Sequence, residues 1–378
     1  MQQYRLEFFK NHYDVNPAFR ELQYVHHTFV NDLPIDDDYI STQTTSIEIE
    51  PTDLVKTGHI LRVLRDNKDY FLGIVTDVSP GEYVTSVAFK PFIAIFDEDI
   101  LFDVTYQYFS SESPGLSLES TLSDYITKYY IQDPDPAQAD PLQYYPMSII
   151  LPEGQHRIYD WNMNIASDSE DDNMALIGFY RDLIVRALKE YGVAIRFKPD
   201  FSLGTIEVTI GRVRGAIDID ANLDNVTVKS FKVNDRPAGI NKLIVTDTLE
   251  NMTATFFVHP NMTWDISNSN RITPVVRGIR TITIDGSYSD DPATDFALAA
   301  YYAAHEELGG LVWDNYMELE CAPDDVLVQP DSLQIGQQVT VHYKGGAYTS
   351  ILTGRIIRVD VVSLLFGSER ISYTKKNR

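Results

Sequence analysis

The chain has 378 residues, of which 44% are hydrophobic, so most of it can bury a core as globular proteins do. This length predicts roughly two to four domains rather than one. Lysine and arginine number 31 against 55 aspartate and glutamate residues, a net charge of −24. Such acidity excludes a protein that wraps nucleic acid, because the surface would repel phosphates. Two interpretations of it stay open: general solubility, or a surface past which DNA slides without sticking.

Three further classes are disfavoured by simple patterns. The sequence contains no run of about eighteen apolar residues, so no transmembrane helix is predicted. The start, Met1 to Arg5, is followed by polar and aromatic residues and lacks the basic and apolar regions of a secretory signal. Cys321 is the only cysteine, which excludes an internal disulfide and a cysteine-rich metal site and fits a reducing compartment.

Residues 1–103 predict a first domain made of short strands. "QYRLEFF" and "SIEIE" alternate apolar and polar residues, and three more strands follow between residues 59 and 91. The spacers 66–69 and 79–82 are rich in turn-forming residues. The pattern predicts a small antiparallel barrel or sandwich.

Residues 104–200 predict an α+β insert. Ser117 is a good N-cap for a helix over 117–131, whose apolar residues share one face. The segments 133–141 and 167–173 read as loops, and a second helical pattern runs from Met174 to Tyr191, with Gly192 as its stop. Strands are expected again from residue 193.

The last two segments predict strands around one more helix. Residues 201–290 are mostly strand and belong to a second barrel and its insert. Residues 291–378 begin with a helix capped by Asp291, with Pro292 at its first position and Gly309-Gly310 at its end. The hairpin 332–359 and the strand 363–374 close the chain. The expected fold class is α+β, predominantly β, with antiparallel strands.

Metal motifs are incomplete. His305-Glu306-Glu307 begins like a zinc-peptidase helix, but residue 309 is glycine where the second histidine belongs. His26 and His27 are adjacent on a strand and cannot both point at one metal. The segment from Asp218 lacks the glycine and the final glutamate of a calcium-binding EF-hand loop. A looser calcium site at Asp218, Asp220 or Asp224, or at residues 36–38, stays open as an alternative.

Catalytic motifs are not found either. The sequence contains no Gly-x-Ser-x-Gly elbow and no phosphate-binding Gly-x-x-x-x-Gly-Lys-Ser/Thr loop. A pair of carboxylates for glycoside hydrolysis stays open, because sequence does not give the separations between acids. We therefore predict no catalytic, cofactor-binding or metal-binding residues and no enzyme.

Four segments resemble one known family. They are "YFLGIVTDV" (70–78), "NDRPAGINKLIVTD" (234–247), "DFALAAYYAAHEELGG" (295–310) and "LQIGQQVTVHYKGGAYTSILTGRIIRV" (333–359). Together they are similar to siphophage tail-tip baseplate hub proteins, the tail-associated lysin or prophage tail family. The chain stops at Arg378, where long members continue, so it resembles the short non-enzymatic form found in lactococcal phage baseplates.

The resemblance implies a fold and a role. It implies two small antiparallel β-barrel domains with α+β inserts, related to the central hub of contractile-tail baseplates. It also implies a homotrimer at the distal end of the tail in the virion, made in the host bacterial cytoplasm, that caps the tube and opens for DNA. The implied partners are the distal tail protein ring, receptor-binding proteins and the tape-measure protein, while DNA passes without specific binding. A cell-wall hydrolase and a carbohydrate-binding receptor protein are the alternative functions.

Overall fold

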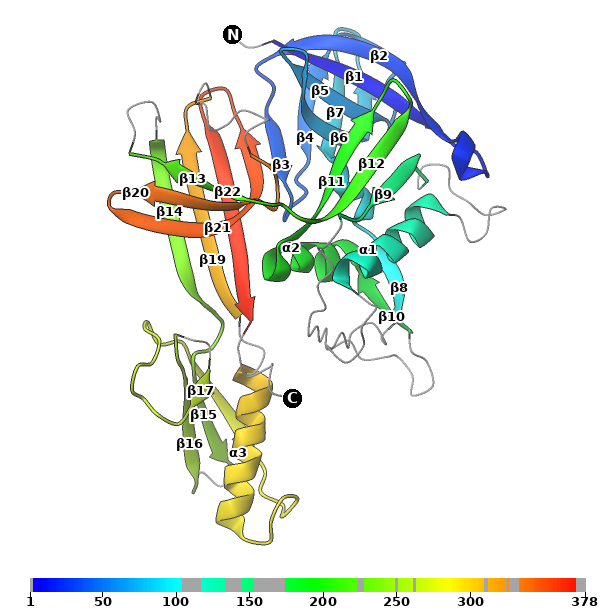
Figure 1. Cartoon of the computed structure of the whole chain (residues 1–378). Coiled ribbons are helices and arrows are strands. Elements are labelled where there is room, and N and C mark those ends of the chain that lie inside the picture. Colours follow the sequence, from blue (N-terminus) through cyan, green and yellow to red (C-terminus); the bar gives the residue numbers. More distant parts are fainter. Residues whose placement is uncertain are drawn as a thin grey trace. The chain divides into compact units, whose positions relative to one another are not determined.

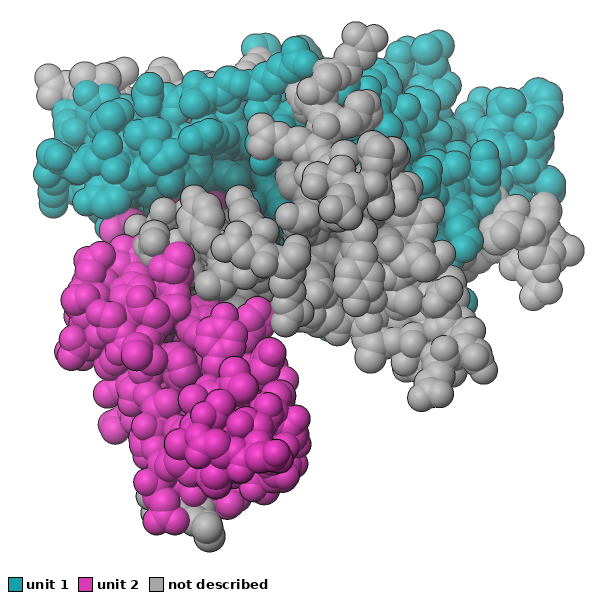
Figure 2. Space-filling view, turned by 60° about the horizontal axis from the view of Figure 1, so that its bottom comes forward, with its two compact units in different colours: residues 1–232, 317–367 teal, residues 233–316, 368–378 magenta. Residues whose placement is uncertain are grey.

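The structure is a computed structural model. It describes residues 3–103, 117–132, 144–152, 174–222, 228–248, 251–260, 263–308, 312–323, 325 and 333–371. The chain forms two compact units, which Figure 2 shows in different colours. Unit 1 comprises Met1–Lys232 and Met317–Gly367, and unit 2 comprises Val233–Tyr316 and Ser368–Arg378. This grouping does not test the predicted boundaries at 103, 200 and 290, which stay predictions.

The first sheet of unit 1 is an antiparallel half-barrel of six strands in the order β2-β1-β5-β6-β7-β4 (Figure 1). Its strands are β1 (Gln3–His12), β2 (Glu21–Asn31), β4 (Thr45–Ile49), β5 (Ile60–Arg65), β6 (Lys68–Pro80) and β7 (Thr85–Pro91). Tyr4, Leu6 and Phe8 alternate into the core. Asp66 and Asn67 both have positive φ, the conformation of a tight hairpin turn, as their composition predicts. The strands expected in residues 1–103 are confirmed.

The second sheet has seven strands, three of which continue from unit 1 into residues assigned to unit 2. Six follow the order β13-β20-β21-β22-β19-β14, and β3 pairs with β21 from the side. They are β3 (Ile35–Asp38), β13 (Ala216–Asp220), β14 (Val228–Ala238), β19 (Val312–Cys321), β20 (Gln338–Tyr343), β21 (Gly346–Ile357) and β22 (Val362–Ile371). The predicted closing hairpin is confirmed as β20 and β21, joined at Lys344-Gly345, where both residues have positive φ.

One hydrophobic core serves both sheets of unit 1. Leu6 and Phe8 from the first sheet belong to the same buried cluster as Val341 and Phe366 from the second. Ile35 of β3 is fully buried within this cluster. Because β3 lies between β2 and β4 in the chain but pairs with β21, the first domain contributes a strand to the second sheet.

An α+β part completes unit 1. Its strands form a three-stranded sheet, β11-β12-β9, and a two-stranded pair, β10-β8. The elements are η1 (Pro17–Phe19), η2 (Phe92–Phe96), β8 (Asp99–Asp103), α1 (Leu118–Ile126), η4 (Thr127–Ile131), β9 (Met147–Ile150), β10 (Met174–Gly178), η5 (Phe179–Val185), α2 (Arg186–Tyr191), β11 (Val193–Asp200) and β12 (Thr205–Arg212). The Ser117 side chain accepts a hydrogen bond from the Ser120 N–H, so the predicted cap is confirmed.

The helix predicted from Met174 begins later than expected. Residues 174–178 form β10, which pairs with β8, and the helical turns start at Phe179. Two features explain the shift. Ile177 finds a cross-strand partner in Ile100, and the Asp182 carboxylate accepts the Gly178 N–H at 2.9 Å at the start of the helical segment. Gly192 ends α2 with a φ of 69°, as predicted.

Unit 2 is a four-stranded sheet in the order β17-β16-β15-β18, covered by one helix. Its elements are β15 (Lys242–Asp247), β16 (Thr253–Val258), β17 (Trp264–Asp265), β18 (Arg277–Ile282) and α3 (Pro292–Leu308). The buried alanines of α3 pack with Leu243, Val245 and Phe256 in a core separate from that of unit 1. Asp291 accepts the Thr294 N–H and caps α3, as predicted, while Gly309-Gly310 lies outside the described residues. None of the described helices combines the length and apolarity that spanning a membrane requires.

Candidate functional site

The outer face of the first sheet carries charged and aromatic side chains that contact one another. The alternation of β1 turns Arg5, Glu7 and Phe9 away from the core. On the edge strand β2, Phe29 pairs with Arg5 and His27 pairs with Glu7. The face therefore carries aromatic and charged side chains in adjacent rows. We define the outer β1–β2 face by its members: Arg5, Glu7, Phe9, Tyr24, His27, Phe29, Arg62 and Asp69.

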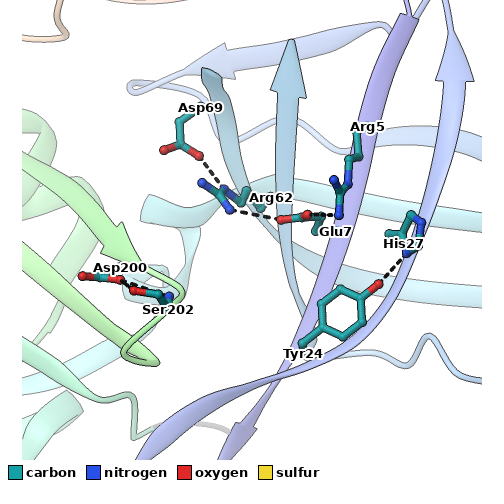
Figure 3. A network of polar contacts seen from close by, with 8 residues as sticks. All are labelled: Arg5, Glu7, Tyr24, His27, Arg62, Asp69, Asp200 and Ser202. Carbon is teal, nitrogen blue, oxygen red and sulfur yellow. Dashed lines mark hydrogen bonds and ion pairs between the residues drawn. The ribbon is translucent and has the colours of Figure 1, made fainter. Parts of the chain in front are cut away.

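A chain of four charges crosses this face, as Figure 3 shows. Glu7 accepts from Arg5 at 2.7 Å and from Arg62 at 3.1 Å, and Arg62 also contacts Asp69 at 2.5 Å. Burial lowers the pKa of Arg62, but the hydrogen bonds and charges of Asp69 and Glu7 outweigh it and raise that pKa. Only 7% of Glu7 is exposed, so the two arginines hold its carboxylate in a fixed place.

Aromatic side chains surround these charges. Tyr24 and Phe29 are each 53% exposed, although they are large and apolar. The Tyr24 hydroxyl lies 2.5 Å from Nδ1 of His27, and the ring of His27 meets that of Phe29 edge-on at 5.9 Å. Phe201, from the turn between β11 and β12, stacks on Phe9 with ring centres 4.1 Å apart.

This combination is typical of a surface that binds another protein. Tyrosine, phenylalanine and arginine are enriched in interfaces and dominate their binding energy. The rings of Tyr24, His27 and Phe29 also restrict one another through their contacts. A partner would therefore find a surface with little side-chain freedom left to lose.

The outer face of the second sheet has a different chemistry. Asp218 and His342 approach to 3.5 Å, the hydroxyls of Thr340 and Thr349 lie 2.9 Å apart, and Lys232 contacts Glu318 at 3.0 Å. These groups are polar or charged, whereas the outer β1–β2 face also carries aromatic rings. The two sheets of one chain thus present unlike surfaces.

Unit 2 carries an exposed surface of its own. Tyr288, Tyr301 and Tyr302 are about half exposed, and the rings of Tyr288 and Tyr302 stack 5.2 Å apart. On the other face of the sheet, Lys242 and Arg271 lie over the ring of Phe257. The three tyrosines offer exposed aromatic groups to a partner, whereas Phe257 is buried beneath its two cationic neighbours.

The acidic triplet 36–38, left open as a calcium site, is occupied by internal partners. Asp36 contacts Arg358 at 2.6 Å, and Asp37 contacts Arg355 at 2.7 Å. Asp38 accepts the Ile40 N–H, and burial raises the pKa of its carboxyl. These aspartates hold β3 against β21, which is a structural task.

The other candidate metal residues are scattered. Asp218 lies near His342, and the Asp220 carboxylate accepts the Asn222 N–H. Asp224 lies outside the described residues. His305 of α3 packs its ring near Trp264. Within the described residues, no group of three or more histidine, cysteine and acidic side chains is placed to hold a metal ion.

Sequence reasoning did not find the outer β1–β2 face. The alternation of Arg5 and Glu7 on an amphipathic strand was a signal that charged groups point outward. The partner Arg62 is 55 residues from Glu7 in the chain, and no local pattern predicts which strands pair.

Sequence comparison gives no relatives: no family model matches the chain, and no curated protein matches it. Comparison with solved structures finds chains of similar fold. The chain is similar to a chain of the structure of the phage P2 baseplate in its activated conformation with Ca, with a TM-score of 0.55 and 11% identity over 97% of this chain and 98% of that one. A topological model of the p2 virion baseplate in activated conformation gives a TM-score of 0.54 at the same identity and coverage.

A third structure is a tail protein from Neisseria meningitidis MC58, with a TM-score of 0.44 and 11% identity over 97% of this chain and 96% of that one. The shared fold rests on the two baseplate structures, which match nearly the whole of both chains. The chain therefore has the fold of a phage baseplate protein, and the predicted fold class, predominantly β with antiparallel sheets, is confirmed.

Proposed function

We propose that this chain is a structural subunit of a phage tail tip, a hub that assembles as a homotrimer at the distal end of the tail. The observation that carries the proposal is the agreement of fold with a phage P2 baseplate chain over 97% of the chain. The hub closes the tail tube, joins it to the distal tail protein ring and the host-adhesion device, and opens to let DNA pass. Its place is the virion, after synthesis in the host cytoplasm.

Two features of the chain support a structural rather than a catalytic role. The outer β1–β2 face has the composition of a protein interface, with exposed Tyr24 and Phe29 around ordered charges. The net charge of −24 suits a wall that DNA passes without adhering. We assign the outer β1–β2 face to the contact with a neighbouring subunit or with the distal tail protein.

The first test is native mass spectrometry of the purified chain, followed by negative-stain images of the same sample. We expect a species of three chains with threefold views. If the chain stays monomeric, the same measurement is repeated with the distal tail protein added. A stable dimer, or a monomer that forms no complex with that protein, would contradict the proposal.

Paired variants test the assigned surface. Tyr24→Ser with Phe29→Ser removes two exposed rings from the outer β1–β2 face, and we expect at least about tenfold weaker assembly, the loss typical of interface aromatics. Tyr83→Ser removes a ring that is 81% exposed in the loop between β6 and β7 and serves as the control. Equal assembly of both variants would show that the contact lies elsewhere.

A zymogram on bacterial cell walls tests the absence of catalysis. We expect no clearing by the purified chain at concentrations at which a phage lysozyme clears the gel. Clearing would assign the chain to the cell-wall hydrolases instead.

A further inference from the structure

Helix α3 covers one face of the four-stranded sheet of unit 2. Leu243 and Val245 of β15 belong to the core on that side. Successive residues of a strand point to opposite faces, so Lys242, Ile244 and Thr246 point away from α3. We call the face that they share with the neighbouring strands the outer unit 2 face.

Strand register gives the members of this face. Lys242 lies between Phe257 of β16 and Arg277 of β18, and Asp265 of β17 lies beyond Phe257. Two further rows contain only uncharged residues. The members are Asp265, Phe257, Lys242 and Arg277 in the first row, Thr255, Ile244 and Ile279 in the second, and Thr253, Thr246 and Thr281 in the third.

The first row is rich in cations. Nζ of Lys242 lies 5.6 Å from the ring centre of Phe257, and the guanidinium of Arg271, from the segment before β18, lies 5.7 Å from the same ring centre. Arg277 is the partner of Lys242 in the strand register, and both arginines are exposed. Three cations therefore gather around one buried ring.

Asp265 does not neutralise these cations. Its carboxylate lies 3.0 Å from Nε2 of His259 and accepts the Ser267 N–H at 2.6 Å. It is the one acidic member of the three rows. Even when it is counted in full, one carboxylate against three cations leaves the outer unit 2 face positive.

Arg280 shows the contrast between the two faces of the sheet. It belongs to the same strand as Arg277 but points to α3, where it contacts Glu306 at 2.6 Å and Glu307 at 3.2 Å. The three cations of the outer unit 2 face form no ion pair with any carboxylate of the described residues. They are therefore available to carboxylates from outside the chain.

The second row adds apolar surface to this charge. Ile279 is 68% exposed and lies beside Ile244 in the register. Covering an exposed isoleucine on association is favourable. Arginine next to apolar side chains is a composition typical of protein interfaces.

The charge pattern also decides the kind of contact. A two-fold dimer through this face would place its cations against their own copies, and like charges repel. The face therefore requires a different, acidic surface. A second copy of this chain supplies one, because the chain has 55 acidic and 31 basic residues although this face is cationic. Contacts between unlike surfaces of identical subunits can close into a ring.

We propose that the outer unit 2 face binds an acidic surface of a second copy of this chain. Lys242, Arg271 and Arg277 are its charged contacts, and Ile279 is its apolar contact. The contact repeats around the ring of the homotrimer, so the inference rests on the proposed function and deepens it. The chain then has a second contact surface in addition to the outer β1–β2 face.

Charge reversal tests this contact. Lys242→Glu with Arg277→Glu places two carboxylates against the acidic surface, and we expect self-association at least about tenfold weaker in sedimentation velocity. Self-association of the wild type should also weaken as NaCl is added, because salt screens exposed charges. Lys56→Glu with Arg181→Glu makes the same change of net charge at exposed positions of unit 1 and should associate like the wild type.

Circular dichroism verifies the fold of each variant, and Lys242→Gln with Arg277→Gln replaces the reversed variant if that one does not fold. Equal association of the reversed variant and the control would overturn the inference and leave the proposed hub intact. A wild type that stays monomeric up to about 100 μM would exclude a second copy as the occupant. The hub is then judged by its complex with the distal tail protein alone.

Cross-linking identifies the occupant directly. A carbodiimide joins the amine of Lys242 to a carboxylate in contact with it, and a mixture of unlabelled chains and chains labelled with heavy nitrogen marks the links between two copies. We expect mass spectrometry to find mixed-label links from Lys242. Links from Lys242 that stay within one chain, or that lead only to an added distal tail protein, would overturn the inference.

Discussion

Buried polar groups connect parts of unit 1 that are distant in the sequence. The Tyr39 hydroxyl accepts the Ile195 N–H at 3.0 Å, and the Tyr180 hydroxyl donates to the carbonyl oxygen of Tyr39. Burial raises the pKa values of both tyrosines above their ordinary range, so both hydroxyls stay protonated at any physiological pH. Single residues thus fix β11 and η5 against the segment that follows β3.

Glu7 connects distant residues on the outer β1–β2 face, where Arg5 and Arg62 share its carboxylate. We expect Glu7→Gln to lower the free energy of unfolding by about 1–3 kcal/mol, because two guanidinium groups lose their shared acceptor charge. Urea unfolding followed by circular dichroism measures this change. Asp66→Asn is the control, since Asp66 is 89% exposed and 3.9 Å from Arg65, and exposed pairs contribute little. Equal midpoints for the two variants would show that the charge chain does not stabilise the sheet.

At the scale of elements, β3 decides how the two sheets of unit 1 are joined. Its register places Asp38 opposite Gly354 of β21, and Arg355 and Arg358 bind the two preceding aspartates, Asp37 and Asp36. The backbones are so close that a Cβ on Gly354 would lie 2.8 Å from the Cα of Asp38. Only glycine permits this approach.

Gly354→Ala should therefore push β3 away from β21. We expect a loss of about 1–3 kcal/mol, the usual cost of forcing an extra methyl group into a packed site, together with faster amide exchange in residues 35–38. Hydrogen exchange and urea unfolding measure both effects. Gly178→Ala is a matched control, because its new Cβ would meet only the flexible end of the Arg181 side chain. Unchanged exchange in β3 would contradict the role given to Gly354.

The loop before α3 depends on another carboxylate. Asp295 accepts the N–H groups of Tyr288 at 2.8 Å, Gly286 at 3.0 Å and Ser289 at 3.2 Å. The bond from Tyr288, with those from Gly286 and Ser289, lowers the pKa of Asp295 below its ordinary 3.8. The stabilisation is therefore present above pH 3.8 and is lost as the pH falls through the lower, folded-state pKa.

Asp295→Asn should consequently destabilise unit 2 most between pH 5 and pH 7, because the anion is then the better acceptor. The difference from the wild type should shrink as the pH falls below about 3.8. Thermal unfolding at a series of pH values measures this dependence. Asp290→Asn, which makes the same change at an exposed neighbour, should have no comparable effect. A difference that persists at low pH would contradict the assignment to the charge.

At the scale of the whole molecule, the two units have separate cores. Leu308 is fully buried against the sheet of unit 2, and Leu319 is fully buried in the core that the two sheets of unit 1 share. Separate cores predict separate unfolding transitions, as is common in chains of several domains.

Calorimetry of two variants tests this independence. Leu308→Ala should cost unit 2 about 2–5 kcal/mol and lower only one transition, and Leu319→Ala should lower only the other. A single transition that both variants shift equally would show that the units unfold together.

The sequence by itself determined most of the local structure. Alternation indicated the strands of the first sheet, and Ser117 and Asp291 indicated where two helices begin. The turn at Lys344-Gly345 indicated the closing hairpin. These features depend on neighbours within a few residues, and propensity, capping and turn chemistry act over that range.

Only the tertiary structure decided how these elements combine. It made residues 174–178 a strand, because β8 offered a partner, and it placed β3 in the second sheet beside Gly354. It also brought Arg62 to Glu7, 55 residues away in the chain. Such contacts join residues far apart in the chain, and their free energy depends on which surfaces become buried together. A local pattern carries no information about that choice, whereas the folded chain fixes it through packing and register.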